Sequence, residues 1–259
     1  MLSVVSFLFG FFITITFSML LTKVASLKDA LAVETGRLVA IYSLSKHLGK
    51  KFHEKIAERI DNYTKITLRD YTQYEKGREI IYGMYEGASL MEIKTLSENE
   101  IVGSFFYILG ELEPVREKLE YLTSRRLEWS LKLSIYVFGS LLIILLFLNR
   151  GDSFTNAIFV ILSTVIVFVF LIIEDYDRLR IGDYAYNISN SEQLFDLIGK
   201  ERYYPESILS RVELEDGKKY RIGFLDRKTH QEKIILMTYS PGFSNRVADL
   251  IKKITNRKG

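Results

Sequence analysis

Hydroxyl-bearing and small side chains recur along one side of the apolar N-terminal segment. On a helical wheel of about 100° per residue, five of them fall within a sector of roughly 120°. Two phenylalanines share this side, and together these residues form what we call the hydroxyl face: Ser3, Ser6, Phe7, Gly10, Thr14, Phe17 and Ser18. Lipid gives no reason to collect hydroxyls on one side of a helix, so this face is expected to meet either water or another helix.

The hydroxyl face has two interpretations. Small residues are common where membrane helices pack against each other, so the face is compatible with a helix interface. Alternatively, copies of the chain form a symmetric ring in which the hydroxyls line an aqueous pore and the phenylalanines form constrictions that gate by dewetting. A single subunit with only three apolar segments cannot enclose a pore, so the second interpretation requires a homo-oligomer.

A second group of residues that could do chemistry follows the last apolar segment. This acidic cluster consists of Glu174, Asp175 and Asp177. Carboxylates at the C-terminal end of a helix oppose its macrodipole, so helix stability does not explain them. Repeated around a ring, they would concentrate cations or bind Ca²⁺ through oxygen ligands. The alternative is simple ion pairing with Arg178 and Arg180. Ca²⁺ or another cation is the one cofactor class that the sequence suggests, and no metal site is firmly predicted.

No catalytic set accompanies these groups. The sequence has no Gly-rich phosphate loop, no dinucleotide-binding fingerprint and no Gly-x-Ser-x-Gly elbow. It has no cysteine, and His47 and His53 are six residues apart, so on a helix they point in different directions. A net charge of only +3 argues against nucleic-acid binding. We therefore expect neither an enzyme nor a nucleic-acid partner.

Three apolar segments predict the elements that position these groups. They are transmembrane helices over residues 1–22, 132–149 and 157–174, with an external turn over 150–156. Lys and Arg residues cluster after the first segment, before the second and after the third, whereas Arg150 alone lies in the turn. The positive-inside rule then predicts a multi-pass protein of the cell membrane, with its N-terminus outside and its C-terminus in the cytoplasm.

The cytoplasmic parts are predicted to be mainly helical, over residues 23–131 and 175–208. The first helix has no break at Lys23 and should continue towards Leu48, with Glu34 as a buried polar residue in its apolar seam. A helix from Ile101 should run through Pro114 into the second span, so that two membrane helices extend into a stalk.

Residues 209–259 are predicted to form a small β-meander with a helix, docked on the helical body. Period-two patterns indicate strands over 211–215, 219–225 and 233–239. Asp216 and Gly217 should form the first hairpin turn, and a last helix should end near Lys253. The fold class is therefore mainly α, an integral membrane protein with three transmembrane helices and a small terminal sheet.

Three short motifs resemble the bestrophin-like family, prokaryotic membrane proteins related in architecture to bestrophin anion channels. The first motif is Glu34 followed by Arg37 and Leu38. The second motif is Arg116 and Leu119, followed by Leu127, Glu128 and Trp129 just before the second span. The third is the stretch 174–183, which contains acidic residues, Leu and Gly. Members of this family usually carry one further N-terminal span. The resemblance implies a pentamer whose first span lines the neck of a central pore, with the acidic stretch similar to a Ca²⁺ clasp.

The function expected from these observations is a homo-oligomeric, pentameric ion channel with passive ion flux along the hydroxyl face. Its partners would be copies of itself, the lipid bilayer and inorganic ions. The alternative is a membrane-anchored signalling or scaffold protein, in which the spans only anchor a cytoplasmic domain that binds a partner.

Overall fold

The computed structural model describes residues 1–69, 74–179, 183–225 and 232–240. It is mostly helical, and three helical stretches are long and apolar enough to cross a membrane, within Leu2–Leu48, Leu96–Leu148 and Ser153–Asp177. The chain divides into two compact units. The first unit comprises Met1–Lys28 and Ser124–Asp183, and the second comprises Asp29–Thr123 and Tyr184–Gly259.

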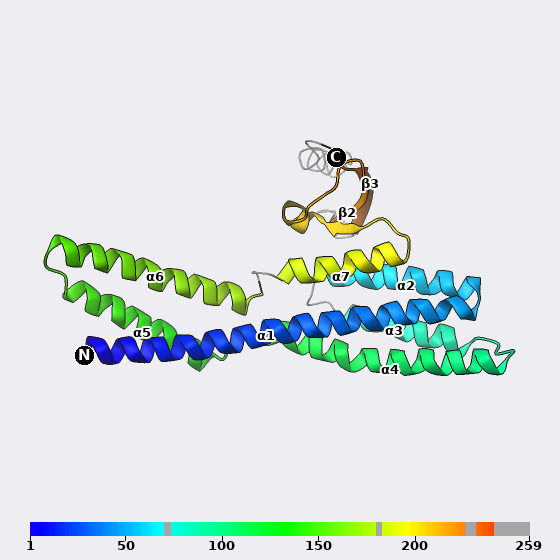
Figure 1. The fold of residues 1–259 in the computed structure, drawn as a ribbon, viewed down its shortest axis with the longest axis horizontal. Coiled ribbons are helices and arrows are strands. Elements are labelled where there is room, and N and C mark those ends of the chain that lie inside the picture. The colour runs from blue at the N-terminus through cyan, green and yellow to red at the C-terminus, as the bar shows by residue number, and fades with distance from the viewer. Residues whose placement is uncertain (70–73, 180–182, 226–231, 241–259) are drawn as a thin grey trace. The chain divides into compact units, whose positions relative to one another are not determined.

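The helix α1 spans Leu2–Ser45 without interruption and is followed by the short 3-10 helix η1, Lys46–Leu48 (Figure 1). The predicted continuation of the first helix beyond Lys23 is therefore confirmed. Its seam residues Leu27, Leu31, Leu38 and Ile41 are all buried. Such a long helix is held mainly by the packing of its apolar positions, because helix propensity alone contributes little.

The first unit contains the N-terminal part of α1 with the hairpin of α5, Trp129–Leu148, and α6, Ser153–Asp177 (Figure 1). Its core is made of aliphatic and aromatic residues from all three helices: Val5, Phe9, Leu20, Ile135, Leu142, Ile166 and Ile173. The turn between α5 and α6 is shorter than the predicted 150–156, because Asp152 and Thr155 form a capping box that starts α6 at Ser153.

The second unit packs helices around the C-terminal part of α1. They are α2 (Lys50–Arg69), α3 (Tyr74–Ser89), α4 (Leu96–Ser124) and α7 (Asp183–Leu197). The core combines fully buried residues of these helices, such as Ile41, Ile60, Phe105 and Phe195, with residues of the sheet. The helices α2, α3 and α4 lie within residues 23–131, which were predicted to be mainly helical.

The sheet contains β1 (Tyr203–Pro205), β2 (Lys219–Leu225) and β3 (Glu232–Thr238), in that order. The strand β1 pairs in parallel with β2, and β3 pairs antiparallel with it. Tyr203, Tyr220 and Ile222 are buried in the same core as the helices. Arg221 on β2 also binds the Asp61 carboxylate of α2 with two hydrogen bonds of 2.9 and 2.6 Å. The sheet is therefore docked on the helical body.

The predicted strand over 211–215 is wrong. Residues Glu206–Arg211 form the 3-10 helix η3, and β1, which the sequence analysis missed, occupies the position beside β2. Asp216 and Gly217 form a turn, with Gly217 at a φ of +78°, but this turn precedes β2 and joins no antiparallel pair of strands. The three strands are consequently not a meander, and the predicted last helix lies outside the described residues.

The predicted continuity between the cytoplasmic helix and the second span is also wrong. The helix α4 contains Pro114 but ends at Ser124, and α5 begins at Trp129. Between them the backbone is not helical, and Glu128 has the extended dihedrals φ −57° and ψ 133°. The physical reason is that Arg126 and Leu127 of this segment donate hydrogen bonds to Asp177 at the end of α6.

The Arg221–Asp61 pair should anchor the sheet. An Arg221→Met substitution removes two charge-assisted hydrogen bonds from a largely buried pair, while Lys65 Nζ still lies 3.0 Å from Asp61. We expect a loss of about 2 kcal/mol in the opening free energy of β2 and β3, measured by amide hydrogen exchange. The control is Lys218→Met, because its ion pair with Glu215 is more than half exposed and should contribute less than about 1 kcal/mol. Equal losses in the two variants would contradict the anchoring role.

Candidate functional site

The hydroxyl face of α1 is uncovered within its unit. Ser3, Ser6, Gly10 and Thr14 are exposed, as are Phe7 and Ser18, whereas Phe17 is half-buried. A Cβ placed on Gly10 would meet nothing within 4 Å. The Thr14 hydroxyl donates to the Gly10 carbonyl oxygen at 2.8 Å, so part of its hydrogen-bonding capacity is met by its own helix. The face therefore has no charged side chain and is open within its unit.

The opposite face of α1 is packed on the α5–α6 hairpin. Val5, Phe9 and Leu20 are buried there. Phe9 meets Phe170 of α6 edge to face with ring centroids 6.2 Å apart, and Phe12 stacks on Phe138 of α5 at 5.4 Å. Aromatic pairs in these geometries add to the stabilisation from apolar burial. The hairpin therefore packs on the side of α1 away from the hydroxyl face, and Thr16, which is outside that face, is buried as well.

Gly139 of α5 makes this close packing sterically feasible. A Cβ at this position would lie 2.3 Å from Phe170 Cζ and 2.8 Å from Phe9 Cε2, which are distances that no real side chain tolerates. Small residues let membrane helices approach closely, so Gly139 is the contact point of the three helices. Sequence reasoning missed it, because one glycine in an apolar helix has no pattern that identifies its neighbours.

Asp177 organises the end of the hairpin. Its side chain is buried, accepts a hydrogen bond of 2.6 Å from the Leu127 backbone N–H, and lies 3.1 Å from Lys132 Nζ. Its backbone carbonyl oxygen accepts from the Arg126 guanidinium at 2.8 Å. Lys23 of α1 donates to the Arg125 carbonyl oxygen at 2.7 Å. These bonds satisfy polar groups of the non-helical segment that precedes α5, and they explain the break there.

The acidic cluster is paired with cations of the chain. Glu174 forms ion pairs with Lys132 and, at 2.6 Å, with Arg178, while Asp177 pairs with Lys132. Asp175 is half-buried. The pairing with Arg178 was one of the two sequence interpretations, Lys132 was not foreseen, and Arg180 lies outside the described residues. Within the described ranges, no group of three or more His, Cys, Asp or Glu side chains could hold a metal ion. The cation site at this cluster stays a prediction.

Glu34 is buried in the second unit, with only 5% of its surface exposed. Tyr63 of α2 donates a hydrogen bond to its carboxylate, and the Arg116 guanidinium of α4 lies 5.6 Å from the centre of the Tyr63 ring. Burial raises the pKa of Glu34 to about 7 from its ordinary value of 4.5, although Tyr63 and Arg116 act in the opposite direction. Gly77 of α3 leaves the space for this arrangement, since a Cβ there would lie 2.8 Å from the Tyr63 ring.

The chain matches no protein-family model, no curated protein sequence and no solved structure. The resemblance to the bestrophin-like family therefore stands on the quoted residues alone. Three of them make polar or ring contacts in the second unit, because Glu34 accepts a hydrogen bond from Tyr63, Arg116 lies over the Tyr63 ring, and Arg37 forms a hydrogen bond of 3.3 Å with Glu111.

A Gly139→Ala substitution tests the packing of the first unit. The added methyl group must displace Phe170 or Phe9, so we expect a loss of about 1–3 kcal/mol in stability, seen as a lower thermal unfolding midpoint in detergent. Gly10→Ala is the matched control, since its methyl group meets nothing and a similar gain in helix propensity applies. A midpoint at or above that of the control would show that the three helices do not meet at Gly139.

The raised pKa of Glu34 predicts a pH-dependent stability. The folded state binds the proton more tightly than the unfolded state, so this stabilisation is complete below about pH 4.5 and is lost as the pH rises towards 7. The loss amounts to about 3 kcal/mol at most. Glu34→Gln keeps an acceptor for Tyr63 and should remove this dependence, whereas the exposed Glu117→Gln should retain it. Thermal unfolding across this pH range measures the difference, and identical slopes in all three proteins would refute the assignment.

Proposed function

We propose that the chain is the subunit of a homo-oligomeric ion channel of the cell membrane, through which ions flow passively along the hydroxyl face of α1. The observation that carries the proposal is the division of α1 into a face packed on the α5–α6 hairpin and a hydroxyl face that its own unit leaves uncovered. In a bilayer, a lone subunit would leave this face to lipid, whereas a symmetric ring gives it water or a neighbouring copy.

The chemistry of the hydroxyl face suits passive conduction. It offers oxygen atoms without a net charge, so it lowers the cost of passing an ion without trapping it at one site. Phe7 is exposed on the same face, with 72% of its surface accessible, and supports an apolar constriction in the path. Because the face is neutral, it selects neither cations nor anions by charge.

The topology follows from the distribution of basic residues. Lys23 and Lys28 follow the first span, Arg125 and Arg126 precede the second, and Arg150 alone lies in the turn between α5 and α6. With the positive-inside rule, the N-terminus and this turn face outward and the second unit is cytoplasmic. A ring of five copies is what the bestrophin-like resemblance implies.

Single-cysteine variants test the aqueous path directly, because the natural chain has no cysteine. Thr14→Cys should react with a charged, membrane-impermeant thiol reagent in vesicles and lose most of its conductance, since water reaches the hydroxyl face. Thr164→Cys on α6 is the matched control. Thr164 is also exposed, and its hydroxyl also donates to the carbonyl oxygen four residues earlier at 2.8 Å. In the proposed ring this residue faces lipid and should stay unreactive.

Two outcomes would contradict the channel. In the first, Thr14→Cys and Thr164→Cys are equally unreactive, which would place the hydroxyl face in lipid or in a dry interface. In the second, purified wild-type protein gives no conductance, so that a Thr14→Trp substitution, whose bulky side chain would block the proposed path, has no conductance to reduce. Either result would favour the alternative of a membrane-anchored signalling or scaffold protein.

A further inference from the structure

The second unit contains a cavity of about 450 Å³ between the start of α2 and the end of α3. None of its lining residues belongs to the hydroxyl face or to the acidic cluster. No carboxylate lines its described part. Four basic residues contribute to its lining: Lys50, Lys51, Lys55 and Arg59. Cavities of this size are typical of sites for small molecules.

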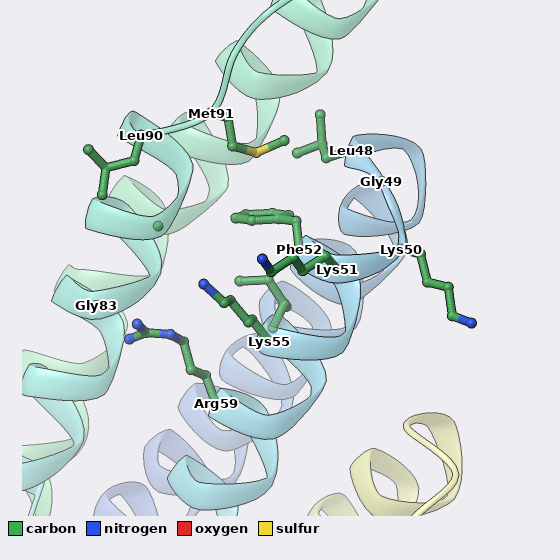
Figure 2. Close-up of a pocket in the computed structure, with 12 residues that line it drawn as sticks. Leu48, Gly49, Lys50, Lys51, Phe52, Lys55, Arg59, Gly83, Leu90 and Met91 are labelled. Carbon is green, nitrogen blue, oxygen red and sulfur yellow. The ribbon is translucent and has the colours of Figure 1, made fainter.

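Three of these cations converge. Lys51, Lys55 and Arg59 are four residues apart on α2, so they lie in one row along the helix. Figure 2 shows their side chains extending towards α3, whereas Lys50 points away from the others. Lys50 lies 4.0 Å from Glu54, but among the described residues none of the three convergent cations forms an ion pair.

This row of cations is unfavourable for the protein by itself. Like charges at spacings of four residues repel one another along a helix. The first turn of α2 carries two lysines and no acidic residue, which also opposes the helix macrodipole. Helix stability therefore gives no reason for the arrangement, and a bound anion would relieve both penalties.

Gly83 of α3 determines where Arg59 lies. A Cβ on Gly83 would fall 1.6 Å from Arg59 Nη1, so the guanidinium occupies the space that the glycine leaves. The same nitrogen donates to the Ile80 carbonyl oxygen at 3.4 Å. Arg59 is thus held against α3 while it lines the cavity, and its guanidinium has further N–H donors of the kind that bind phosphate.

The floor of the cavity is apolar. Leu48, Phe52 and Ile56 are buried, and Met91 lines the cavity with them (Figure 2). A ligand that fits this combination carries a multiply charged phosphate group for the cations and has an apolar part for the floor. A phospholipid headgroup with its adjoining chains and a free phosphorylated compound share this chemistry.

We propose that this cavity is a binding site for a phosphate-bearing ligand, held by Lys51, Lys55 and Arg59. Two probes distinguish the sources, each titrated calorimetrically into the full-length protein in detergent: inorganic pyrophosphate and dioctanoyl phosphatidic acid, whose phosphate is also multiply charged. Lys51→Gln and Arg59→Gln should each weaken binding about tenfold, because each removes a charge-assisted hydrogen bond. Lys50→Gln changes the net charge equally and should stay within about twofold of the wild type.

A second pair of variants changes no charge. Gly83→Ala must push the Arg59 guanidinium aside and should weaken binding several-fold. Gly87→Ala is its control, because its Cβ would make an ordinary contact of 3.7 Å with Phe52. Both substitutions favour the helix, so a folding defect is not expected from the backbone.

The two titrations distinguish a free phosphorylated ligand from a lipid headgroup. Binding of pyrophosphate with these losses supports the site and a free phosphorylated ligand, and binding of the lipid alone with the same losses supports the site and a headgroup. If neither probe binds, or if Lys50→Gln loses as much affinity as Lys51→Gln, the proposal is overturned. None of these readouts depends on conductance, so the channel and this site can fail independently.

Discussion

The packing of α1 against the α5–α6 hairpin is the constraint on which the rest of the first unit depends. Phe9, Gly139 and Phe170 meet at one point, and the glycine fixes how closely the helices approach. This contact uses one side of α1 and directs the hydroxyl face to the other. Lipid offers hydroxyls no advantage over apolar side chains, so this face should meet water or protein instead. The proposed oligomer provides that environment, because it places the hydroxyl faces of several copies around one axis.

Asp177 sets the second constraint, at the boundary of the apolar helices. A buried carboxylate is costly unless it is hydrogen-bonded and paired, and here the Leu127 N–H and Lys132 satisfy it. The same bonds hold the chain in a non-helical path between α4 and α5. The acidic cluster is therefore first a structural device, and any cation bound there would have to compete with Lys132 and Arg178.

Sequence patterns predicted the features that depend on local periodicity and failed on those that depend on tertiary neighbours. The three apolar helices, the continuation of α1 and strands β2 and β3 are visible in hydropathy and period. The non-helical segment Arg125–Glu128 between α4 and α5 depends on Asp177, about fifty residues later in the chain. The strand β1 has only three residues, too few to show the alternation of apolar and polar residues that identifies a strand. The row of Lys51, Lys55 and Arg59 is visible in the sequence, but the residues of α3 that complete the cavity, such as Gly83, are brought there by the tertiary fold.

The two units of the chain differ in what they present: the apolar unit has the hydroxyl face, and the helical unit with the sheet has the buried Glu34 and the basic cavity. We propose above all that copies of the chain assemble so that their hydroxyl faces share one axis. Mass measurement of the detergent-solubilised complex tests this claim most directly. We predict a complex with the mass of several chains, five being the number that the family resemblance implies, and a complex that contains a single chain would contradict the proposal.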